Sequence, residues 1–438
     1  MSNSLQRYEK KLYLCNEMAQ LPLAFTDYTR RLMGDERFER YLQSFEEEPP
    51  VSIRLNPKKA ENMEVIDGKQ VPWCRNAYYL KSRPNFTMDP LLHAGCYYVQ
   101  EAASMFLDEV LRQAEANSSL FILHSSLKAL DLCAAPGGKS TLLRAALPDN
   151  CVLYSNEPMR QRANILAENV EKWGYGSHLV TNVYPKVFRR SKLRFDVILC
   201  DVPCSGEGMF RKDPATIREW SSQQVEKCWQ LQRDIVTDAW TCLNPGGLLI
   251  YSTCTFNTKE NEENIRWMLE EFDDAESIPV DVNPDWHITG SLLPGFDEPV
   301  YRFIPGISRG EGLFMCVLRK KGCLPTAPSK RRGSATASNL PLLLEGAGGK
   351  LAETWSESVE LSYPQAISYL RGEALVLPDD TPRGIIEVCF MGHPLGQVKN
   401  IGSRANNLYP KPWRIKTTYI PQEYTPILTN KSSLNSKL

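Results

Sequence analysis

Two cysteines follow apolar runs that have the composition of buried strands. The run FDVILC leads into Asp201-Val202-Pro203-Cys204, and the run LLIYST leads into Cys254. Because the carboxyl ends of parallel strands meet at one edge of a sheet, we expect both thiols at that edge, beside the Asp201 carboxylate. A lone free cysteine is usually a small buried hydrophobic residue, which is how we interpret Cys133, Cys151, Cys200, Cys228 and Cys242. Two cysteines at neighbouring strand ends instead indicate chemistry.

The chemistry that suits such a pair is alkylation at carbon 5 of a pyrimidine. A thiolate that adds to carbon 6 makes carbon 5 nucleophilic enough to attack an electrophilic methyl group. A carboxyl group such as that of Asp201 can protonate or hydrogen-bond N3 of the base and stabilise the adduct. A second thiol can assist release of the product. The residues alone do not decide which cysteine attacks.

A glycine-containing turn follows an earlier apolar run, KALDL. Its residues are Cys133, Ala134, Ala135, Pro136, Gly137, Gly138 and Lys139. Small residues at a strand-to-helix turn let a ligand approach the backbone. A phosphate-binding P-loop would need glycine at Cys133, so that interpretation fails. Glu157 follows the next predicted strand, about 20 residues later, where a carboxylate can bind ribose hydroxyls. Together the two features favour a nucleoside cofactor.

These residues lie in a region, from about Lys128 to Arg319, where short apolar runs alternate with amphipathic stretches. That alternation predicts an α/β fold with a doubly wound, mostly parallel, Rossmann-like sheet. Before it, residues 21–45 read as helices with an apolar stripe, and Val51–Asn56 alternates like a strand. After it, residues 320–341 are rich in Pro, Gly, Ser and basic residues and read as a linker. Short strands are predicted in the last domain.

Composition excludes several classes of protein. The chain has 438 residues with a net charge of -1, so a histone-like nucleic-acid binder is not expected, although a local basic groove is possible. No apolar stretch is long enough for a membrane span, and the first residues lack the apolar core of a secretory signal. The 13 cysteines form no C-x-x-C pair and there are 5 histidines, so neither a disulfide framework nor a metal site is expected. We expect a monomer in the reducing cytoplasm.

The strings DLCAAPGGKS, DVPCSGEGMFRKDP and YSTCTFNTKENEENI resemble the RNA cytosine-5 methyltransferases of the Nop/Sun type. SIRLNP and GCYYVQEAASMF, upstream, are also similar to that family. YLRGEAL, PLGQVKN and NNLYPKPWRIK resemble its bacterial RsmF branch, which acts on small-subunit ribosomal RNA. The resemblance covers most of the chain outside the linker, and the motifs occur in the family's order. It implies a class I methyltransferase fold.

The resemblance also implies roles for individual residues. S-adenosylmethionine would be the methyl donor, with Cys133 to Lys139 around its methionine part and Glu157 on its ribose. Lys139 and Asp201 would serve both cofactor binding and catalysis, with Asp201 between the cofactor and the target base. Cys254 would be the nucleophile, and Cys204 would help to release the product. Many members carry an Asp at the position of Tyr184, so we leave the adenine contact open between backbone groups and Asn182.

The resemblance implies three domains, with a linker between the second and the third. We expect an N-terminal α+β RNA-binding subdomain (1–92), a methyltransferase domain (93–320), a linker (321–355) and a PUA-like RNA-binding domain (356–438). Arg54 and Asn56 are predicted to face RNA. Residues 391–416 carry five basic residues and no acidic one, with Tyr409 and Trp413 among them, a mix that binds phosphates and stacks bases. The basic run 186–194 is either an RNA contact or a solvated face.

The expected substrate is 16S ribosomal RNA, free or within the small subunit. Two rivals stay open: the same chemistry on transfer RNA, and a non-catalytic RNA-binding assembly factor. The second would be expected to have lost Cys254, Asp201 or the glycine turn, and none is lost. DNA is not expected as a substrate. The string Glu168-Asn169-Val170 matches a DNA methyltransferase signature, but it precedes Pro203-Cys204, whereas in those enzymes it follows the Pro-Cys motif.

Overall fold

The computed structural model describes residues 21–117, 127–322, 342–344, 357–417, 419–421 and 423–431. These residues form two compact units, and each unit is built from several separate segments of the chain. The cysteine unit comprises 21–49, 201–237 and 250–321, and the glycine-turn unit comprises the other described residues. Within the described residues, no helix combines the length and the apolar character that a membrane span needs.

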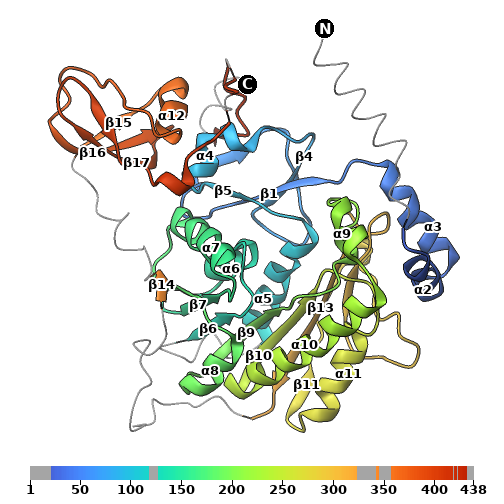
Figure 1. The fold of residues 1–438 in the computed structure, drawn as a ribbon. Coiled ribbons are helices and arrows are strands. Elements are labelled where there is room, and N and C mark those ends of the chain that lie inside the picture. Colours follow the sequence, from blue (N-terminus) through green and yellow to red (C-terminus); the bar gives the residue numbers. More distant parts are fainter. Residues whose placement is uncertain are drawn as a thin grey trace. The chain divides into compact units, whose positions relative to one another are not determined.

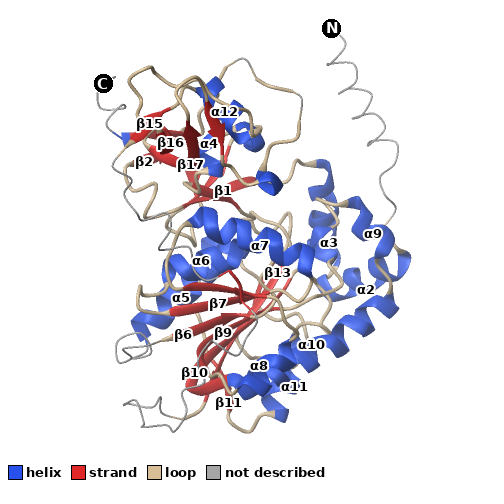
Figure 2. Ribbon diagram, turned by 60° about the vertical axis from the view of Figure 1, so that its left-hand side comes forward, coloured by secondary structure: helices blue, strands red, loops and turns tan. Residues whose placement is uncertain are grey.

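The glycine-turn unit contains the parallel sheet that the sequence predicts. Strands lie in the order β9-β6-β7-β8, and each neighbouring pair is parallel. Their bounds are β6 Lys128–Asp131, β7 Val152–Asn156, β8 His178–Thr181 and β9 Phe195–Asp201. Helices α5 (Phe106–Asn117), α6 (Gly138–Ala146), α7 (Arg160–Trp173) and α8 (Pro185–Ser191) connect or flank these strands (Figures 1 and 2). The predicted alternation of buried strands and helices is confirmed.

An unpredicted strand, β14 (Leu342–Leu344), pairs antiparallel with β8. It lies within the predicted linker (321–355), of which residues 323–341 and 345–355 fall outside the described parts of the chain. The linker and the expected domain boundaries therefore stay predictions.

The cysteine unit begins with two helices, α2 (Leu23–Met33) and α3 (Asp35–Gln43), separated by Gly34. Phe25, Phe38 and Tyr41 of the predicted apolar stripe are buried in one core with Phe210 and Phe256. The unit also holds α9 Pro214–Glu219, α11 Glu262–Glu271, β11 Ala275–Ser277, β12 Tyr301–Phe303 and β13 Leu313–Lys320. Strand β13 pairs antiparallel with β11 and β12. Helix α10 (Ser222–Cys242) and strand β10 (Leu243–Thr253) run from one unit into the other.

A second sheet of the glycine-turn unit contains the predicted strand Val51–Asn56 as β1. Its order is β3-β4-β1-β5, with β1 Val51–Leu55, β3 Lys69–Gln70, β4 Ala77–Leu80 and β5 Tyr97–Val99. Short helices α4 (Pro90–His93) and η3 (Ala103–Met105) surround β5 in the chain.

The C-terminal part of the same unit is a small β-rich domain, as predicted. Strands β15 (Ser358–Glu360), β16 (Gly384–Phe390), β17 (His393–Asn400) and β18 (Ala405–Asn407) form one sheet in that order, with helix α12 (Tyr363–Leu370). One hydrophobic core joins this domain to the β1–β5 region: Ile53, Leu91 and Tyr97 share it with Ile367 and Val388. The last strand, β19 (Leu428–Asn430), pairs with β2 (Met63–Val65). The two regions are therefore parts of one packed body, with the C-terminal domain next to α4 in Figure 1.

Candidate functional site

The Cys204 and Cys254 thiols lie together in the cysteine unit. Their sulfur atoms are 3.4 Å apart, a hydrogen-bond separation between free thiols. Val202 N donates to Ser252 O at 3.1 Å, so the chain just after β9 runs beside the end of β10. Both cysteines are partly exposed, unlike Cys200, Cys228 and Cys316, which are buried. The predicted placement at neighbouring strand ends is confirmed.

The surroundings of the Cys204 thiol favour its neutral form. The hydrogen bond to Cys254 and, next, burial raise the pKa of Cys204 well above its ordinary value. Two adjacent thiols cannot both ionise at low cost, because the second thiolate would face the first. The neighbouring thiol and burial therefore both favour the neutral form of Cys204.

Asp201, the last residue of β9, lies next to this pair in the chain. Its side chain is partly exposed and accepts a hydrogen bond from Ser252 Oγ at 2.6 Å. Ser252 precedes Cys254 by two residues on β10. The carboxylate is thus fixed by the strand that leads to the second thiol.

Two buried carboxylates tie the loop that carries Cys204 to the loop that carries Cys254. Glu207 accepts from the backbone N–H groups of Phe256 (2.8 Å) and Asn257 (2.9 Å), and from Trp220 Nε1 (3.1 Å). Carboxylates that accept several N–H bonds in a buried site make strong, geometrically defined contacts. Glu207, which lies on the loop after Cys204, therefore holds the loop after Cys254 in place.

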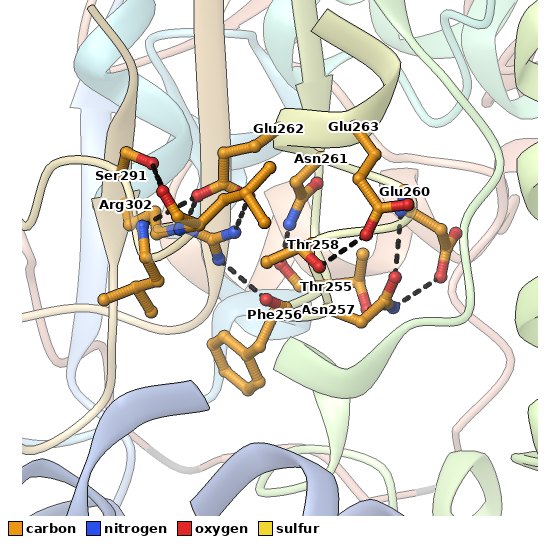
Figure 3. Close-up of polar contacts among 12 residues, drawn as sticks. Thr255, Phe256, Asn257, Thr258, Glu260, Asn261, Glu262, Glu263, Ser291 and Arg302 are labelled. Atoms are coloured by element: carbon orange, nitrogen blue, oxygen red, sulfur yellow. Dashed lines mark hydrogen bonds and ion pairs between the residues drawn. The ribbon is translucent and has the colours of Figure 1, made fainter. Parts of the chain in front are cut away.

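Glu260 makes the reciprocal connection. It accepts from Ser205 N at 3.0 Å, from Gln232 Nε2 at 2.7 Å and from Asn257 Nδ2 at 2.8 Å. Its side chain is fully buried, and this burial raises its pKa. Figure 3 shows Glu260 and Asn257 facing each other within the loop that follows Thr255.

Behind this loop lies a buried ion pair between Arg302 and Glu262. Arg302 Nε donates to Glu262 Oε1 at 2.8 Å, and its Nη1 donates to the carbonyl of Phe256 at 2.8 Å (Figure 3). Breaking a buried pair by removing one partner leaves an uncompensated charge. The pair therefore fixes the loop after Cys254 to β12.

Two glycines let the loops approach each other. A Cβ on Gly208 would lie 2.7 Å from Gly312 Cα and 2.9 Å from the carbonyl oxygen of Cys254. Gly208 N donates to that same carbonyl at 2.8 Å. The string CSGEG therefore needs a glycine at position 208 for close backbone approach.

In the glycine-turn unit, the turn after β6 opens helix α6. Gly137 is the N-cap, with φ 115°, a left-handed conformation that favours glycine. Ser140 Oγ donates to Asp131 Oδ2 at 2.5 Å and fixes the first helical turn to the strand end. Cys133 and Lys139 are partly exposed, and Ala134 and Ala135 are buried. The helix N-terminus, free of bulky side chains, fits the polar end of a nucleoside cofactor.

Glu157 directly follows β7 and is buried to 1% exposure. Its Oε1 accepts from Met159 N at 2.9 Å, and its Oε2 forms an ion pair with Arg162 at 3.2 Å. Arg162 also donates to the carbonyl of Ala135 at 2.9 Å, so it connects the carboxylate to the glycine turn. A carboxylate held at this strand end fits the predicted ribose contact.

Asn156, which sequence reasoning did not single out, joins three strand ends. Its Nδ2 donates to the carbonyls of Leu132 (3.1 Å) and Val183 (2.9 Å), and its Oδ1 accepts from Thr181 Oγ1 at 2.9 Å. Asn182 donates to the carbonyls of Glu157 and Pro158 at 2.7 and 2.9 Å. Tyr184 is exposed. The adenine contact stays open.

The prediction that Arg54 and Asn56 face RNA is wrong. Both are buried, at 2% and 0% exposure. Asn56 Nδ2 donates to the carbonyls of Gly95 and Trp173, both at 2.9 Å, while Arg54 contacts α6 and Trp173. The strand pattern gave no sign that a helix terminus would cover its polar side chains.

The proposed base-stacking role of Tyr409 is also wrong. Its ring is 3% exposed and packs against Tyr369 and Trp413 in the shared core. Trp413 is partly buried in that cluster. Of the five basic residues, Lys399, Arg404, Lys411 and Lys416 are exposed. The basic run 186–194 includes helix α8, and its Arg189 pairs with Asp238 at 3.0 Å. These exposed cations can contact phosphates, and RNA contact by either segment stays a prediction.

Comparisons with known proteins agree along most of the chain. Residues 21–102 match the N-terminal domain of 16S rRNA methyltransferase RsmF, residues 121–319 match the family 16S rRNA methyltransferase RsmB/F, and residues 356–415 match the RsmF PUA domain. A relative from Pectobacterium atrosepticum, named ribosomal RNA small subunit methyltransferase F, is 31% identical over 78% of this chain and 72% of its own length. The protein of that name from Escherichia coli K12 is 28% identical over 89% of this chain and 96% of its own.

Two solved structures from Pyrococcus horikoshii share the fold. A methyltransferase homologue is 24% identical, with a TM-score of 0.54, over 68% of this chain and 100% of that one. NSun6, solved with SFG, is 18% identical, with a TM-score of 0.53, over 69% of this chain and 99% of that one.

Proposed function

The chain belongs to the RsmB/F family of 16S rRNA methyltransferases, and from that membership we propose that it methylates carbon 5 of a cytosine in 16S ribosomal RNA. The observation that carries the chemistry is the pair of free thiols 3.4 Å apart beside Asp201. Such a pair suits addition to a pyrimidine followed by elimination.

S-adenosylmethionine, when bound, supplies an electrophilic methyl group. The residues that would hold it are Cys133 to Lys139 at the N-terminus of α6 and Glu157 after β7. A helix N-terminus suits the cofactor's carboxylate, and a strand-end carboxylate suits its ribose hydroxyls.

Cys254 would then be the nucleophile. Its thiolate forms a bond with carbon 6 of the cytosine, and the electron pair of the 5,6 double bond makes carbon 5 nucleophilic. Asp201 protonates or hydrogen-bonds N3 as negative charge develops on the ring. The raised pKa of Cys204 supports this assignment, because it favours the neutral thiol, which is the poorer nucleophile.

Release requires loss of the carbon 5 proton and of the enzyme sulfur. As a general base takes the carbon 5 proton, the electrons of the carbon–hydrogen bond restore the 5,6 double bond and expel Cys254 from carbon 6 as a thiolate. Cys204 would assist this elimination from 3.4 Å away. The target base must be unpaired or flipped, since carbon 6 is attacked from above the ring plane.

Bisulfite sequencing of ribosomal and transfer RNA, from cells with and without this protein, tests the proposal. We expect at least one cytosine of 16S ribosomal RNA that resists conversion only when the protein is present. Protein-dependent protection confined to transfer RNA would reject the substrate, and no protected cytosine in either RNA would reject the reaction.

A further inference from the structure

Arg54 of strand β1 is a fully buried cation directly behind the glycine turn. Its Nη2 donates to Thr141 Oγ1 at 2.6 Å and to the carbonyl of Gly138 at 3.1 Å. Its Nε donates to Gln100 Oε1 at 2.9 Å, and its guanidinium carbon lies 4.5 Å from the ring centroid of Trp173. Every one of these contacts lies within the glycine-turn unit.

Burying a guanidinium costs free energy unless an anion or several acceptors compensate. Burial lowers the pKa of Arg54 to about 10, so the group stays charged near neutral pH. The buried Asp108 carboxylate favours the charged form of Arg54. The printed hydrogen bonds of the guanidinium go to a carbonyl, a hydroxyl and an amide oxygen, and an aromatic ring lies against it.

The acceptors identify what this charge holds. Gly138 and Thr141 form the first turn of α6, and Thr141 Oγ1 itself donates to the carbonyl of Gly137 at 2.8 Å. The neighbouring carbonyl of Pro136 accepts from Asn169 Nδ2 at 2.8 Å and from the Tyr98 hydroxyl at 3.3 Å. Side chains of β1, β5, α6 and α7 thus fix the consecutive carbonyls of Pro136, Gly137 and Gly138 from the protein side of the turn.

We propose that Arg54 is a positioning residue that holds the α6 N-terminus in its cofactor-binding conformation and adds positive potential for the cofactor's amino-acid carboxylate. This inference rests on the proposed function, because it concerns the same cofactor. A buried cation is screened far less than a surface one, so its charge acts across the turn. Together with the partial positive charge of the helix N-terminus, it favours an anionic ligand there.

The test compares two ligands in the full-length chain. S-adenosylhomocysteine carries the amino-acid part, whereas 5′-methylthioadenosine keeps only the nucleoside and a methylthio group. In Arg54→Met, calorimetry should show about tenfold weaker binding of S-adenosylhomocysteine, the size of effect expected for a charged hydrogen-bond group. Binding of 5′-methylthioadenosine should change less than about twofold. Arg54→Lys keeps the positive charge but loses the planar, multiply donating guanidinium group. Its affinity for S-adenosylhomocysteine should lie between those of wild type and Arg54→Met.

Arg144→Met is the matched control. Arg144 lies on the same helix, is equally buried and donates to the carbonyls of Cys151, Leu147 and Pro148, away from the turn. It should lower thermal stability without changing the ratio of the two affinities. An unchanged ratio in Arg54→Met would overturn the inference while leaving the proposed function intact. Failure of the wild-type chain to bind S-adenosylhomocysteine would instead reject the proposed cofactor, and the inference with it.

Discussion

The thiols of Cys204 and Cys254 are chemically equivalent in sequence but not in the fold. Their sulfur atoms are neighbours, and the other thiol and burial raise the pKa of Cys204. A thiol that retains its proton is a poor nucleophile and a suitable assistant for a later step. Their roles can be separated by substituting one at a time.

Cys254→Ala should be inactive and form no covalent RNA complex, because the attacking sulfur is gone. Cys204→Ala should form the adduct and transfer methyl but stall before release. The stalled thioether survives denaturation and is measured as a slower RNA–protein band on a denaturing gel. The double variant should show no band, and Cys228→Ala, a buried cysteine in the same unit, should behave like wild type. Accumulation of the complex in Cys254→Ala, but not in Cys204→Ala, would reverse the assignment.

The loops that carry the two cysteines are joined by side chains rather than by a ladder of backbone bonds. Glu260 illustrates this arrangement, because its two carboxylate oxygens meet donors from Ser205, Gln232 and Asn257. An amide at this position would place an NH2 group against one of these donors. The loops therefore depend on a side chain that accepts at both atoms.

Glu260→Gln should lower the free energy of unfolding by about 1–3 kcal/mol, the cost of an unmet buried donor. It should also reduce methyl transfer, since Ser205 follows Cys204. Glu263→Gln is the control, because Glu263 is only partly buried and accepts from Thr258 Oγ1 at 2.8 Å. Urea denaturation and a methyl-transfer assay measure both effects. Equal losses in the two variants would show that Glu260 has no special part in joining the loops.

Sequence patterns predicted the elements well and their side-chain contacts poorly. Apolar runs located β6, β7, β8 and β9, because continuous burial leaves a periodic signal in the chain. Strand ends located the cysteine pair, since parallel strands share an edge. The hydrogen bonds from Phe256 to Glu207 and from Ser205 to Glu260 join residues about 50 positions apart, and no local pattern encodes such a pairing.

The two corrected predictions have the same physical origin. Arg54 and Tyr409 are polar or amphipathic, so sequence reasoning placed them in contact with RNA. In the fold, neighbouring elements supply acceptors for Arg54 and a hydrophobic core for the Tyr409 ring. Burial by elements distant in the chain cannot be inferred from a strand's own alternation.

The glycine-turn unit is held together by a core that its first and last segments share. Residues from 53 to 97 pack against residues from 361 to 428. Removing the C-terminal domain would therefore expose apolar side chains of the β1–β5 region. Tests of RNA capture should change the surface of this domain and leave its core intact.

A variant with Lys399, Arg404, Lys411 and Lys416 all replaced by serine should bind RNA more weakly. These cations are exposed, so their loss should flatten the dependence of log Kd on log salt by up to about 3 units, at roughly 0.7 per phosphate contact. Titrations at several salt concentrations measure the slope. A control that exchanges the same lysines for arginine, and Arg404 for lysine, should keep the wild-type slope. Identical slopes in the serine variant and the wild type would exclude this surface from RNA capture.

His93 makes the shared core sensitive to acid. Burial and then the nearby Lys172 ammonium lower the pKa of His93 to about 4, and its ring contacts the Thr87 carbonyl (2.9 Å) and the Tyr409 hydroxyl (3.5 Å). Between pH 6.5 and 4 the unfolded chain therefore binds a proton that the native state does not, so stability falls as the pH falls through this range.

His93→Gln should remove part of that loss. The free energy of unfolding, measured by urea denaturation at pH 7 and pH 5, should differ less in this variant than in wild type. His287→Gln, at an exposed position, should keep the wild-type difference. An undiminished difference in His93→Gln would show that the acid sensitivity arises elsewhere.

The pairing of β19 with β2 also has a consequence for how the chain is made. Met63–Val65 leaves the ribosome early, but its strand partner Leu428–Asn430 is translated roughly 360 residues later. At about 5–20 residues per second, the partner arrives roughly 20–70 s afterwards. During that interval the nascent chain carries an unpaired strand edge and part of an uncovered apolar core, both of which can engage a chaperone. Completion of this unit therefore waits for translation of Leu428–Asn430, and a chain truncated before that segment cannot form this strand pair.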